Sequence, residues 1–399
     1  MKKQSEKKLK VAVIVKYFYP VAAGIETNIM ETYSVLAKKG IEVDIHTSRD
    51  TLTEKDVLVD QETIRGLNVK RYPYKWFGYF PQIDYQNIDA VCLHNFNIIP
   101  HLYILLYSWY LKQIGKKNFA LILTPHGGFN PEWSIFKPLQ RIIKQKYHYT
   151  VGTYLINLIV DGVRAVSDWE NKEMVKKGVK ENKVVTIDNG IEDEAYLNLD
   201  KLASNEIKSK VKNFGKYFIQ IGRIYSIKNY ETTIKALSLL PKDINYVIAG
   251  PVGSNEYFDK LKTQINKLGL QKRVFFVGVI RGIDKYYMIK KAQMMVHMAL
   301  WESYCNVVHE GLSQGLVCIV ANNTALPLLV KDGVNGYCVE TKDYQEVAKK
   351  IKYVLDNKKT KFILDMEKRN QKYGLENSWQ NVALKMQNFY EKKVSEVRS

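Results

Sequence analysis

The chain has 399 residues, a length that favours two domains rather than a single core. Hydrophobic residues make up 46% of it and charged residues 25%, which is typical of a globular protein and argues against a disordered or membrane-embedded one. The formal charge of +19 attracts anionic partners and leaves three classes open: nucleic acid, anionic lipid and diphosphate-bearing substrates.

The cysteine content and the N-terminal sequence favour a cytoplasmic protein. The four cysteines include no C-x-x-C pair, so neither a zinc knuckle nor a disulfide framework is supported. The apolar run at residues 11–15 ends at Lys16, before it reaches the length of a signal peptide.

One apolar stretch, residues 98–111, is shorter than the roughly 20 residues that a membrane-spanning helix needs. It predicts a buried or surface-inserting helix. Its aromatic residues, together with basic segments near both ends of the chain, are compatible with peripheral attachment to an anionic membrane surface, at the inner face of the membrane.

Short apolar runs alternate with segments of helical periodicity, which is typical of βα units and parallel sheets. In the first half we predict a helix at residues 25–39 and strands near residues 11–15, 43–47, 69–72, 90–93, 120–124 and 164–167. The pattern restarts after a polar segment at residues 188–212, with strands near residues 217–221, 246–249, 274–277, 294–298, 317–320 and 337–339. Residues 342–399 read as helical.

This pattern predicts an α/β protein with two Rossmann-like, doubly wound parallel-sheet domains. We place the first domain at residues 1–198 and the second at residues 199–375. A C-terminal helix at residues 376–399 could cap the second domain or cross back to the first.

Loops that follow strands should carry the functional residues, because open α/β sheets bind ligands at the carboxyl ends of their strands. In the first half, Gly24 precedes a helix, where a glycine lets backbone N–H groups approach a phosphate. His126 stands between Pro125 and two glycines, so it could project from the sheet edge and hydrogen-bond a sugar hydroxyl. A turn histidine bonded to the backbone is the alternative. Residues 188–191, Asp-Asn-Gly-Ile, predict a tight turn with positive φ.

Two loops of the second half carry charged residues suited to a nucleotide. Arg223 and Lys228 follow a strand, and a planar guanidinium with a nearby ammonium suits a diphosphate. Glu302 and Glu310 stand at the start of a later helix, where Glu310 could accept hydrogen bonds from a ribose diol. The free N–H groups of residues 305–307 would point at a phosphate or a donor sugar. One-sided surface charge and exposed carboxylates are the alternatives.

In this order, the motifs resemble those of the retaining GT-B glycosyltransferases of family 4, which build lipopolysaccharide, capsule and glycolipid chains. The resemblance spans nearly the whole chain, and the seven-residue glutamate spacing with the Arg and Lys loop is its specific part. It implies two domains that face each other across a cleft, a nucleotide-diphosphate sugar as donor, and a glycan or lipid-linked acceptor.

The resemblance also implies roles for individual residues. Arg223 and Lys228 would stabilise the leaving diphosphate, Glu310 would hold the ribose and Glu302 would contact the donor sugar. His126 would lie beside the transferred sugar. The implied catalytic residues are His126, Arg223, Lys228 and Glu302, and the implied donor-binding residues are Gly24, Arg223, Lys228, Gly278, Val279, Glu302, Tyr304, Cys305, Asn306, Val307 and Glu310.

The chain departs from the family at two loops. Ser303-Tyr304-Cys305 replaces the usual Gly-Phe-Gly, and Ala23-Gly24 replaces a double glycine. Since no Asp-x-Asp pair occurs, we expect neither a metal nor any cofactor beyond the nucleotide-sugar co-substrate. A nucleotide-sugar epimerase on the same fold and a non-catalytic scaffold subunit are the alternatives. Nucleic-acid binding is not expected, because no basic-aromatic module is recognisable.

Overall fold

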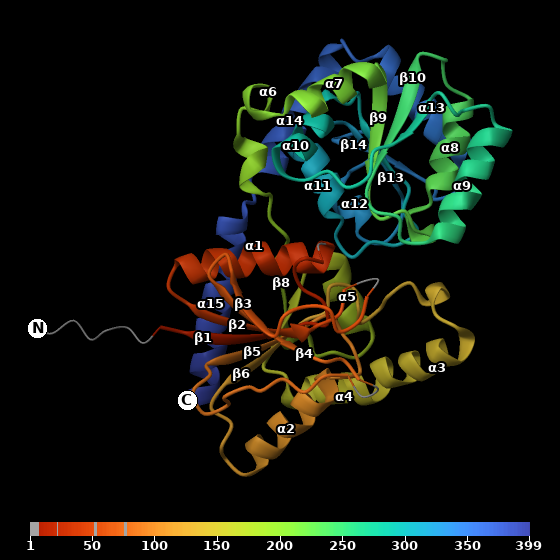
Figure 1. The fold of residues 1–399 in the computed structure, drawn as a ribbon. Coiled ribbons are helices and arrows are strands. Elements are labelled where there is room, and N and C mark those ends of the chain that lie inside the picture. The colour runs from red at the N-terminus through yellow and green to blue at the C-terminus, as the bar shows by residue number, and fades with distance from the viewer. Residues whose placement is uncertain (1–7, 22, 52–53, 76–77) are drawn as a thin grey trace, which may run out of the picture. The chain divides into compact units, whose positions relative to one another are not determined.

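The structure is a computed structural model that describes residues 8–21, 23–51, 54–75 and 78–399. It divides into two compact units: unit 1, formed by Met1–Gly190 with Trp379–Ser399, and unit 2, formed by Ile191–Ser378. The predicted divisions at residues 198/199 and 375/376 lie a few residues from these. Each unit contains its own predominantly parallel sheet with helices on it, which confirms the predicted fold class (Figure 1).

Unit 1 contains, within its described residues, an eight-stranded sheet in the order β3-β4-β2-β1-β5-β6-β7-β8. All neighbouring strands are parallel except β3 and β4. The strands are β1 (Lys10–Ile14), β2 (Glu42–Ser48), β3 (Gln61–Ile64), β4 (Leu67–Tyr72), β5 (Ala90–His94), β6 (Ala120–Thr124), β7 (Gly162–Ala165) and β8 (Val184–Thr186). The helices are α1 (Gly24–Lys38), α2 (His101–Gln113), α3 (Pro138–Tyr147), α4 (Thr153–Ile159), α5 (Asp168–Lys176) and α15 (Trp379–Arg398).

Two apolar clusters cover the two faces of this sheet. Helices α1 and α15 pack side by side on one face, although they lie at opposite ends of the sequence (Figure 1). Helices α2, α4 and α5 contribute to the cluster on the other face. Strands β5 and β6 are buried along their whole length. Burial on both faces explains why the central strands read as continuous apolar runs.

Unit 2 contains, in the part of the chain that is described, a six-stranded parallel sheet in the order β11-β10-β9-β12-β13-β14. Its strands are β9 (Lys216–Ile221), β10 (Ile244–Ala249), β11 (Val274–Phe276), β12 (Met295–His297), β13 (Cys318–Ala321) and β14 (Gly336–Val339). Its helices are α6 (Leu199–Leu202), α7 (Asn205–Phe214), α8 (Tyr230–Ser238), α9 (Asn255–Lys267), α10 (Gly282–Lys291), α11 (Asn306–Ser313), α12 (Leu326–Leu329), α13 (Tyr344–Asp356) and α14 (Lys361–Leu375).

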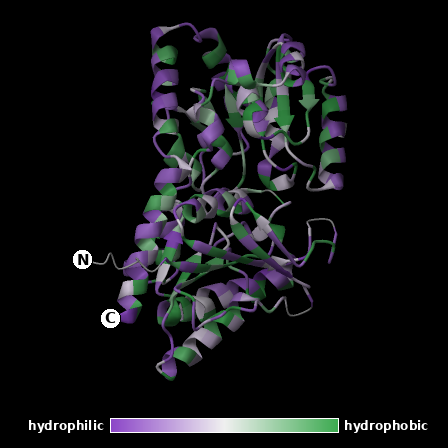
Figure 2. Cartoon of the chain, turned by 60° about the vertical axis from the view of Figure 1, so that its left-hand side comes forward, coloured by the Kyte–Doolittle hydropathy of each residue, from purple (hydrophilic) through white to green (hydrophobic). Residues whose placement is uncertain are grey.

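The helices of unit 2 form two groups, α8 with α9 and α13, and α10 with α11 and α14. The outer helices alternate between hydrophobic and hydrophilic residues (Figure 2). This is the amphipathic pattern of helices that cover a buried sheet.

Three local expectations are corrected by the structure. Helices α6 and α7 of unit 2 begin within the polar segment at residues 188–212, for which no helix was predicted. Strand β3, which was not predicted, is an edge strand with three exposed residues and therefore has no apolar run. Asn189 and Gly190 lack a positive φ. Asn189 instead accepts hydrogen bonds from Asn28 and Arg164 through its side chain.

Candidate functional site

Lys228 and Glu302 are joined at the carboxyl edge of the unit 2 sheet. Lys228 ends a 3₁₀ turn (Ser226–Lys228) after β9, and Glu302 lies in the loop after β12. The ammonium nitrogen of Lys228 is 2.5 Å from Oε1 of Glu302, and both side chains are mostly buried. Two of the predicted site residues are therefore brought into direct contact.

The electrostatics of this pair keep Glu302 ionised. Burial alone would raise the pKa of Glu302, but the Lys228 ammonium and the hydrogen bond from His297 lower it to about 2. His297 Nε2 lies 2.8 Å from the same oxygen, Oε1. A carboxylate with this pKa can accept hydrogen bonds from sugar hydroxyls at any physiological pH.

His297, Glu302 and Cys305 place one potential metal-ligand atom each within 4.8 Å of one another. The Lys228 ammonium is bound to the same Glu302 oxygen that a metal would use. An ion bound by this oxygen would lie close to the ammonium, and two neighbouring cations repel each other.

Arg223 follows β9 directly and is exposed, with its aliphatic carbons packed over Gly253 in the loop after β10. A Cβ at position 253 would lie 2.5 Å from Cδ of Arg223, so the glycine leaves the room for this packing. Arg223 forms no ion pair with any described residue, in contrast to Lys228. Its guanidinium is therefore available to an anionic ligand.

Glu310 lies in the second turn of α11 and belongs to a second charged cluster. Its Oε1 is 3.1 Å from the ammonium nitrogen of Lys285 on α10, and this nitrogen is also 2.7 Å from Oε2 of Glu192. Burial raises the pKa of Glu310 to about 7. Burial opposes the charge on Lys285, yet the two carboxylates raise the pKa of its ammonium, so it stays charged. Oε2 of Glu310 is buried and has no hydrogen-bond partner among the described residues.

The loop before α11 contains a strained residue. Cys305 precedes α11 with φ 86° and ψ 74°, in the left-handed region that a residue with a Cβ rarely adopts. Tyr304, just before it, is buried, and its hydroxyl pairs with Nδ1 of His309 at 2.9 Å. Asn306 and Val307 form the first turn of α11, where backbone N–H groups have no preceding turn to bond.

Gly278 and Val279 follow β11 at the same edge of the sheet. Gly278 has φ 71°, and its carbonyl accepts a hydrogen bond of 2.7 Å from the amide of Gly250. Val279 is exposed. This loop is thus tied to the loop after β10 and presents its backbone at the strand ends.

In unit 1, Gly24 is the first residue of α1. A Cβ built on Gly24 would meet no atom within 4 Å, so the space beside it is open. The amide of Ala23 donates to Oε2 of Glu26 at 3.2 Å, which caps the helix. Ala22, in the same loop, lies outside the described residues.

His126 is also in unit 1, in the turn after β6, with φ 51°. Its Nε2 lies 2.8 Å from Nδ1 of His94, so its ring is bonded to a side chain, and among the described residues it has no backbone partner. The turn is fixed by Glu170 on α5, which accepts hydrogen bonds from the amides of Gly127 and Val166.

The sequence matches two family descriptions that divide the chain between them. Residues 22–195 match "Glycosyltransferase Family 4" and residues 203–374 match "Glycosyl transferases group 1". The chain is a family 4, group 1 glycosyltransferase. Neither the epimerase nor the scaffold alternative is supported by these comparisons.

Relatives agree with this family, and a solved structure has the same fold. The glycosyltransferase is 28% identical over 177 residues to the poly(glycerol-phosphate) alpha-glucosyltransferase of Bacillus subtilis, a match of 44% of this chain that spans only 26% of that protein. It is 23% identical over 383 residues to an uncharacterized glycosyltransferase of Methanocaldococcus jannaschii, covering 91% and 94% of the two chains. The crystal structure of Anabaena HepE in complex with UDP and glucose superposes with a TM-score of 0.76 at 15% identity, covering 96% of this chain and all of that one.

Sequence reasoning missed the residues that hold the predicted ones in place. Lys285 contacts Glu310 and is itself held by Glu192, His297 contacts Glu302, and Glu170 with His94 fixes the His126 turn. Except for His297, which precedes Glu302 by five residues, each is far from its partner in sequence, so no local motif marks it.

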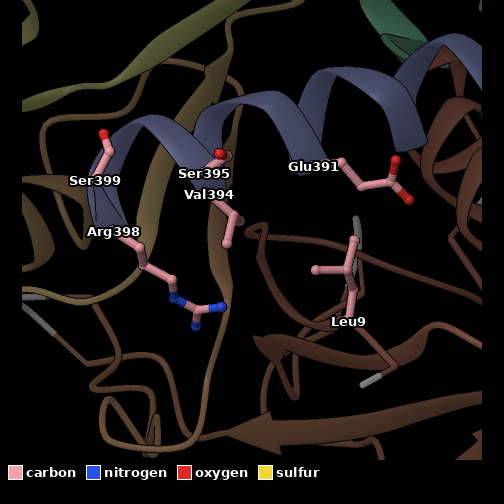
Figure 3. Close-up of a pocket in the computed structure, with 6 residues that line it drawn as sticks. All are labelled: Leu9, Glu391, Val394, Ser395, Arg398 and Ser399. Carbon is pink, nitrogen blue, oxygen red and sulfur yellow. The ribbon is translucent and has the colours of Figure 1, made fainter. Parts of the chain in front are cut away.

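Unit 1 of the glycosyltransferase has a shallow depression of about 500 Å³ at the edge of its sheet where the parallel strands begin (Figure 3). Leu9, at the start of β1, lines it with residues from the C-terminal half of α15. Arg398 of α15 donates to Asp89 and to the carbonyl of Asn118, which precede β5 and β6. Because ligands of this fold bind at the carboxyl ends of the strands, this depression is separate from the candidate site.

Proposed function

We propose that this glycosyltransferase moves a sugar from a nucleotide-diphosphate sugar to a glycan or lipid-linked acceptor, with retention of anomeric configuration and without a metal. The observation that carries the proposal is Glu310. Its Oε1 is held by Lys285, while Oε2 is buried without a partner among the described residues. A buried carboxylate oxygen of this kind is costly unless a donor reaches it, and a ribose diol would supply two hydroxyl donors.

The diphosphate is assigned to Arg223 and Lys228. The free guanidinium of Arg223 can bind two phosphate oxygens in a planar fork, and Lys228 adds a point charge. Both charges stay in place as negative charge grows on the leaving group, so they lower the barrier without a metal. The Lys228 ammonium beside Glu302 is the further argument against a metal at this position.

The proposed classes of donor and acceptor are inferred from the names of similar proteins. A nucleotide diphosphate is the ligand of HepE in its crystal structure, and the Bacillus subtilis relative is named for glucosyl transfer to a glycerol-phosphate polymer. The prefix alpha in that name describes the linkage of the product. A retaining transfer from an α-linked donor gives this linkage. His126 is assigned to contact the transferred sugar, and Gly24 to let the start of α1 approach the phosphates.

We also propose that the acceptor is met at an anionic membrane surface through α2 and α3 of unit 1. Helix α3 has no buried residue and exposes Leu139 (70%), Ile142 and Ile143. Helix α2 exposes Trp109 and Tyr110 among other apolar residues. Between residues 90 and 160 the chain has seven Lys or Arg residues and one acidic residue, Glu132. Exposed apolar side chains among cations suit the interface of an anionic bilayer.

Among the described residues, no helix is both long enough and apolar enough to cross a bilayer. Sedimentation with vesicles of phosphatidylglycerol and phosphatidylcholine should retain the wild type, and Leu139→Ser with Ile142→Ser should release it. Leu364→Ser, at an exposed position of α14, is the control. Equal retention of the wild type, the double variant and the control would refute the membrane surface.

A thermal-shift panel of nucleotide-diphosphate sugars in EDTA tests the proposed reaction. A ligand at about 100 times its Kd stabilises by about 2.7 kcal/mol, which should raise Tm by roughly 5 °C for a domain of this size. The donor that gives this shift is then supplied with lipid-linked or glycan acceptors, and the anomeric configuration of the first product is read by ¹H NMR. An α-linked donor should give an α-linked product. A β-linked product, or activity that disappears in EDTA, would contradict the proposed mechanism.

A further inference from the structure

A chain of four buried or partly buried side chains runs from His126 into the interior of unit 1. His126 Nε2 lies 2.8 Å from Nδ1 of His94, and His94 Nε2 lies 2.8 Å from the hydroxyl of Tyr33. The Tyr33 hydroxyl is 2.6 Å from the hydroxyl of Tyr390 on α15. The four residues come from the β6 turn, β5, α1 and α15, so the C-terminal helix reaches the interior side of the candidate sugar-binding residue.

No member of this chain carries a charge near neutral pH. Burial lowers the pKa of His94 and of His126 well below the usual value, and the nearby guanidinium of Arg164 lowers both further. Burial raises the pKa of Tyr33 and of Tyr390 well above theirs. Each link is therefore a hydrogen bond between neutral groups, with one donor and one acceptor.

Two arrangements of the histidine protons satisfy the links. In the first, His126 donates from Nε2 to His94 and His94 donates from Nε2 to Tyr33, whose hydroxyl either donates to Tyr390 or accepts from it. In the second, Tyr390 donates to Tyr33, Tyr33 donates to His94 and His94 donates to His126, so both histidines carry their proton on Nδ1. The two histidines must therefore share the same tautomer. The first arrangement leaves Nδ1 of His126 as an acceptor, and the second makes it a donor.

The backbone of His126 is fixed as firmly as its ring. His126 (φ 51°) and Gly127 (φ 80°) are both in the left-handed region. The amide of Gly127 donates to Glu170, and a Cβ on Gly128 would lie 1.9 Å from the side-chain oxygen of Asn95. His94 holds the ring and Glu170 holds the turn. Of the two ring nitrogens of His126, Nδ1 is the one that has no partner among the described residues.

We propose that His94, Tyr33 and Tyr390 are positioning residues for His126: their hydrogen-bonded chain fixes its ring orientation and couples its tautomer to that of His94, so that Nδ1 meets the substrate as donor or acceptor according to the arrangement that the chain adopts. This inference rests on the proposed role of His126 beside the transferred sugar.

The tautomers can be measured without any activity assay. The protein has seven histidines, few enough for the ring nitrogens of His94 and His126 to be assigned in ¹⁵N-labelled protein with His→Asn variants. At about pH 7.5, two-bond ¹H–¹⁵N spectra should show both rings neutral and in the same tautomer. A protonated ring, or one ring with the proton on Nδ1 and the other on Nε2, would overturn the inference even if transfer is confirmed.

Turnover tests the functional consequence. Tyr33→Phe and Tyr390→Phe each break the chain, and each should lower kcat about tenfold with the donor KM within about twofold, because the misplaced ring affects the transition state and not donor binding. Tyr79→Phe is the control: Tyr79 is equally buried in unit 1, but its hydroxyl donates to the carbonyls of Val15 and His46. If both chain variants keep the turnover of Tyr79→Phe, the inference fails. If the wild type transfers no sugar but shows the shared tautomer, only the proposed function fails.

Discussion

The ammonium nitrogen of Lys228 lies 2.5 Å from Oε1 of Glu302, so a residue assigned to the diphosphate is bound to a residue assigned to the donor sugar. This contact couples the two assignments. A diphosphate that binds Lys228 must share it with Glu302, and a sugar that binds Glu302 does so while its negative charge is already partly balanced.

Glu302→Gln separates these two roles. The variant should bind a nucleoside diphosphate at least as tightly as the wild type, because Lys228 loses its anionic partner, while sugar transfer should fall by at least about tenfold. Calorimetric titration and initial rates would measure the two effects. Glu340→Gln, at an exposed carboxylate after β14, should change neither. Loss of nucleotide affinity in parallel with turnover would show that Glu302 does not compete for Lys228.

Arg223→Ala should depress kcat more than it raises the donor KM, since charge on the diphosphate grows in the transition state. We expect kcat to fall by about two orders of magnitude, which corresponds to about 2.7 kcal/mol of transition-state stabilisation. Arg369→Ala, at an exposed arginine of α14, is the matched control. An increase in KM with unchanged kcat would restrict Arg223 to ground-state binding.

Glu170 should make stability depend on pH. Burial raises the pKa of Glu170 to about 7, from 4.5 for the usual side chain. Since the folded pKa is the higher one, this contribution is fully present below about pH 4.5 and is lost as the pH rises through about 7. Between these limits, the free energy of unfolding of Glu170→Gln should rise relative to wild type by on the order of 3 kcal/mol. Urea unfolding at several pH values measures it, with Glu173→Gln on the same helix as control. A constant difference between variant and wild type would contradict the assignment.

Much of the fold could be predicted from the sequence because its strands are buried on both faces. Strand β6, at residues 120–124, was predicted with its observed bounds, since all five of its residues are apolar or buried. The edge strand Gln61–Ile64 was missed, because an exposed antiparallel strand needs no apolar run. The unit boundary at Gly190 was missed by eight residues, as the helices that follow it are short and polar.

The site could be predicted only where a loop carries its own signal. Arg223, Lys228, Glu302 and Glu310 stand in short motifs after strands. The residues that hold the site in place do not stand in such motifs. Lys285 contacts Glu310 from another helix, and Glu170 holds Gly127 of the His126 turn across 43 residues of sequence. Such contacts depend on the packing of helices against the sheet, which spacing along the chain does not reveal.

Cys305 stores backbone strain at the start of α11. A left-handed φ costs a residue with a Cβ roughly 1–2 kcal/mol, so Cys305→Gly should unfold with a free energy about 1 kcal/mol higher than Cys305→Ala. The same pair of variants at Cys318 should show the reverse order, because Cys318 lies in strand β13, where glycine is less stable than alanine. Thermal and urea unfolding of the four variants would measure both differences. A more stable Cys305→Ala would refute the strain.

The free oxygen of Glu310 is the feature on which the donor assignment depends, and nucleotide affinity tests it most directly. Calorimetric titration of UDP, followed by ADP, GDP and CDP if UDP does not bind, should give a Kd for Glu310→Ala at least about tenfold above wild type, a loss of about 1.4 kcal/mol. Glu206→Ala, which removes an exposed carboxylate of the same unit, should leave the Kd unchanged. If a nucleotide binds the wild type and folded Glu310→Ala equally well, Glu310 does not hold the ribose and the account of the site is wrong.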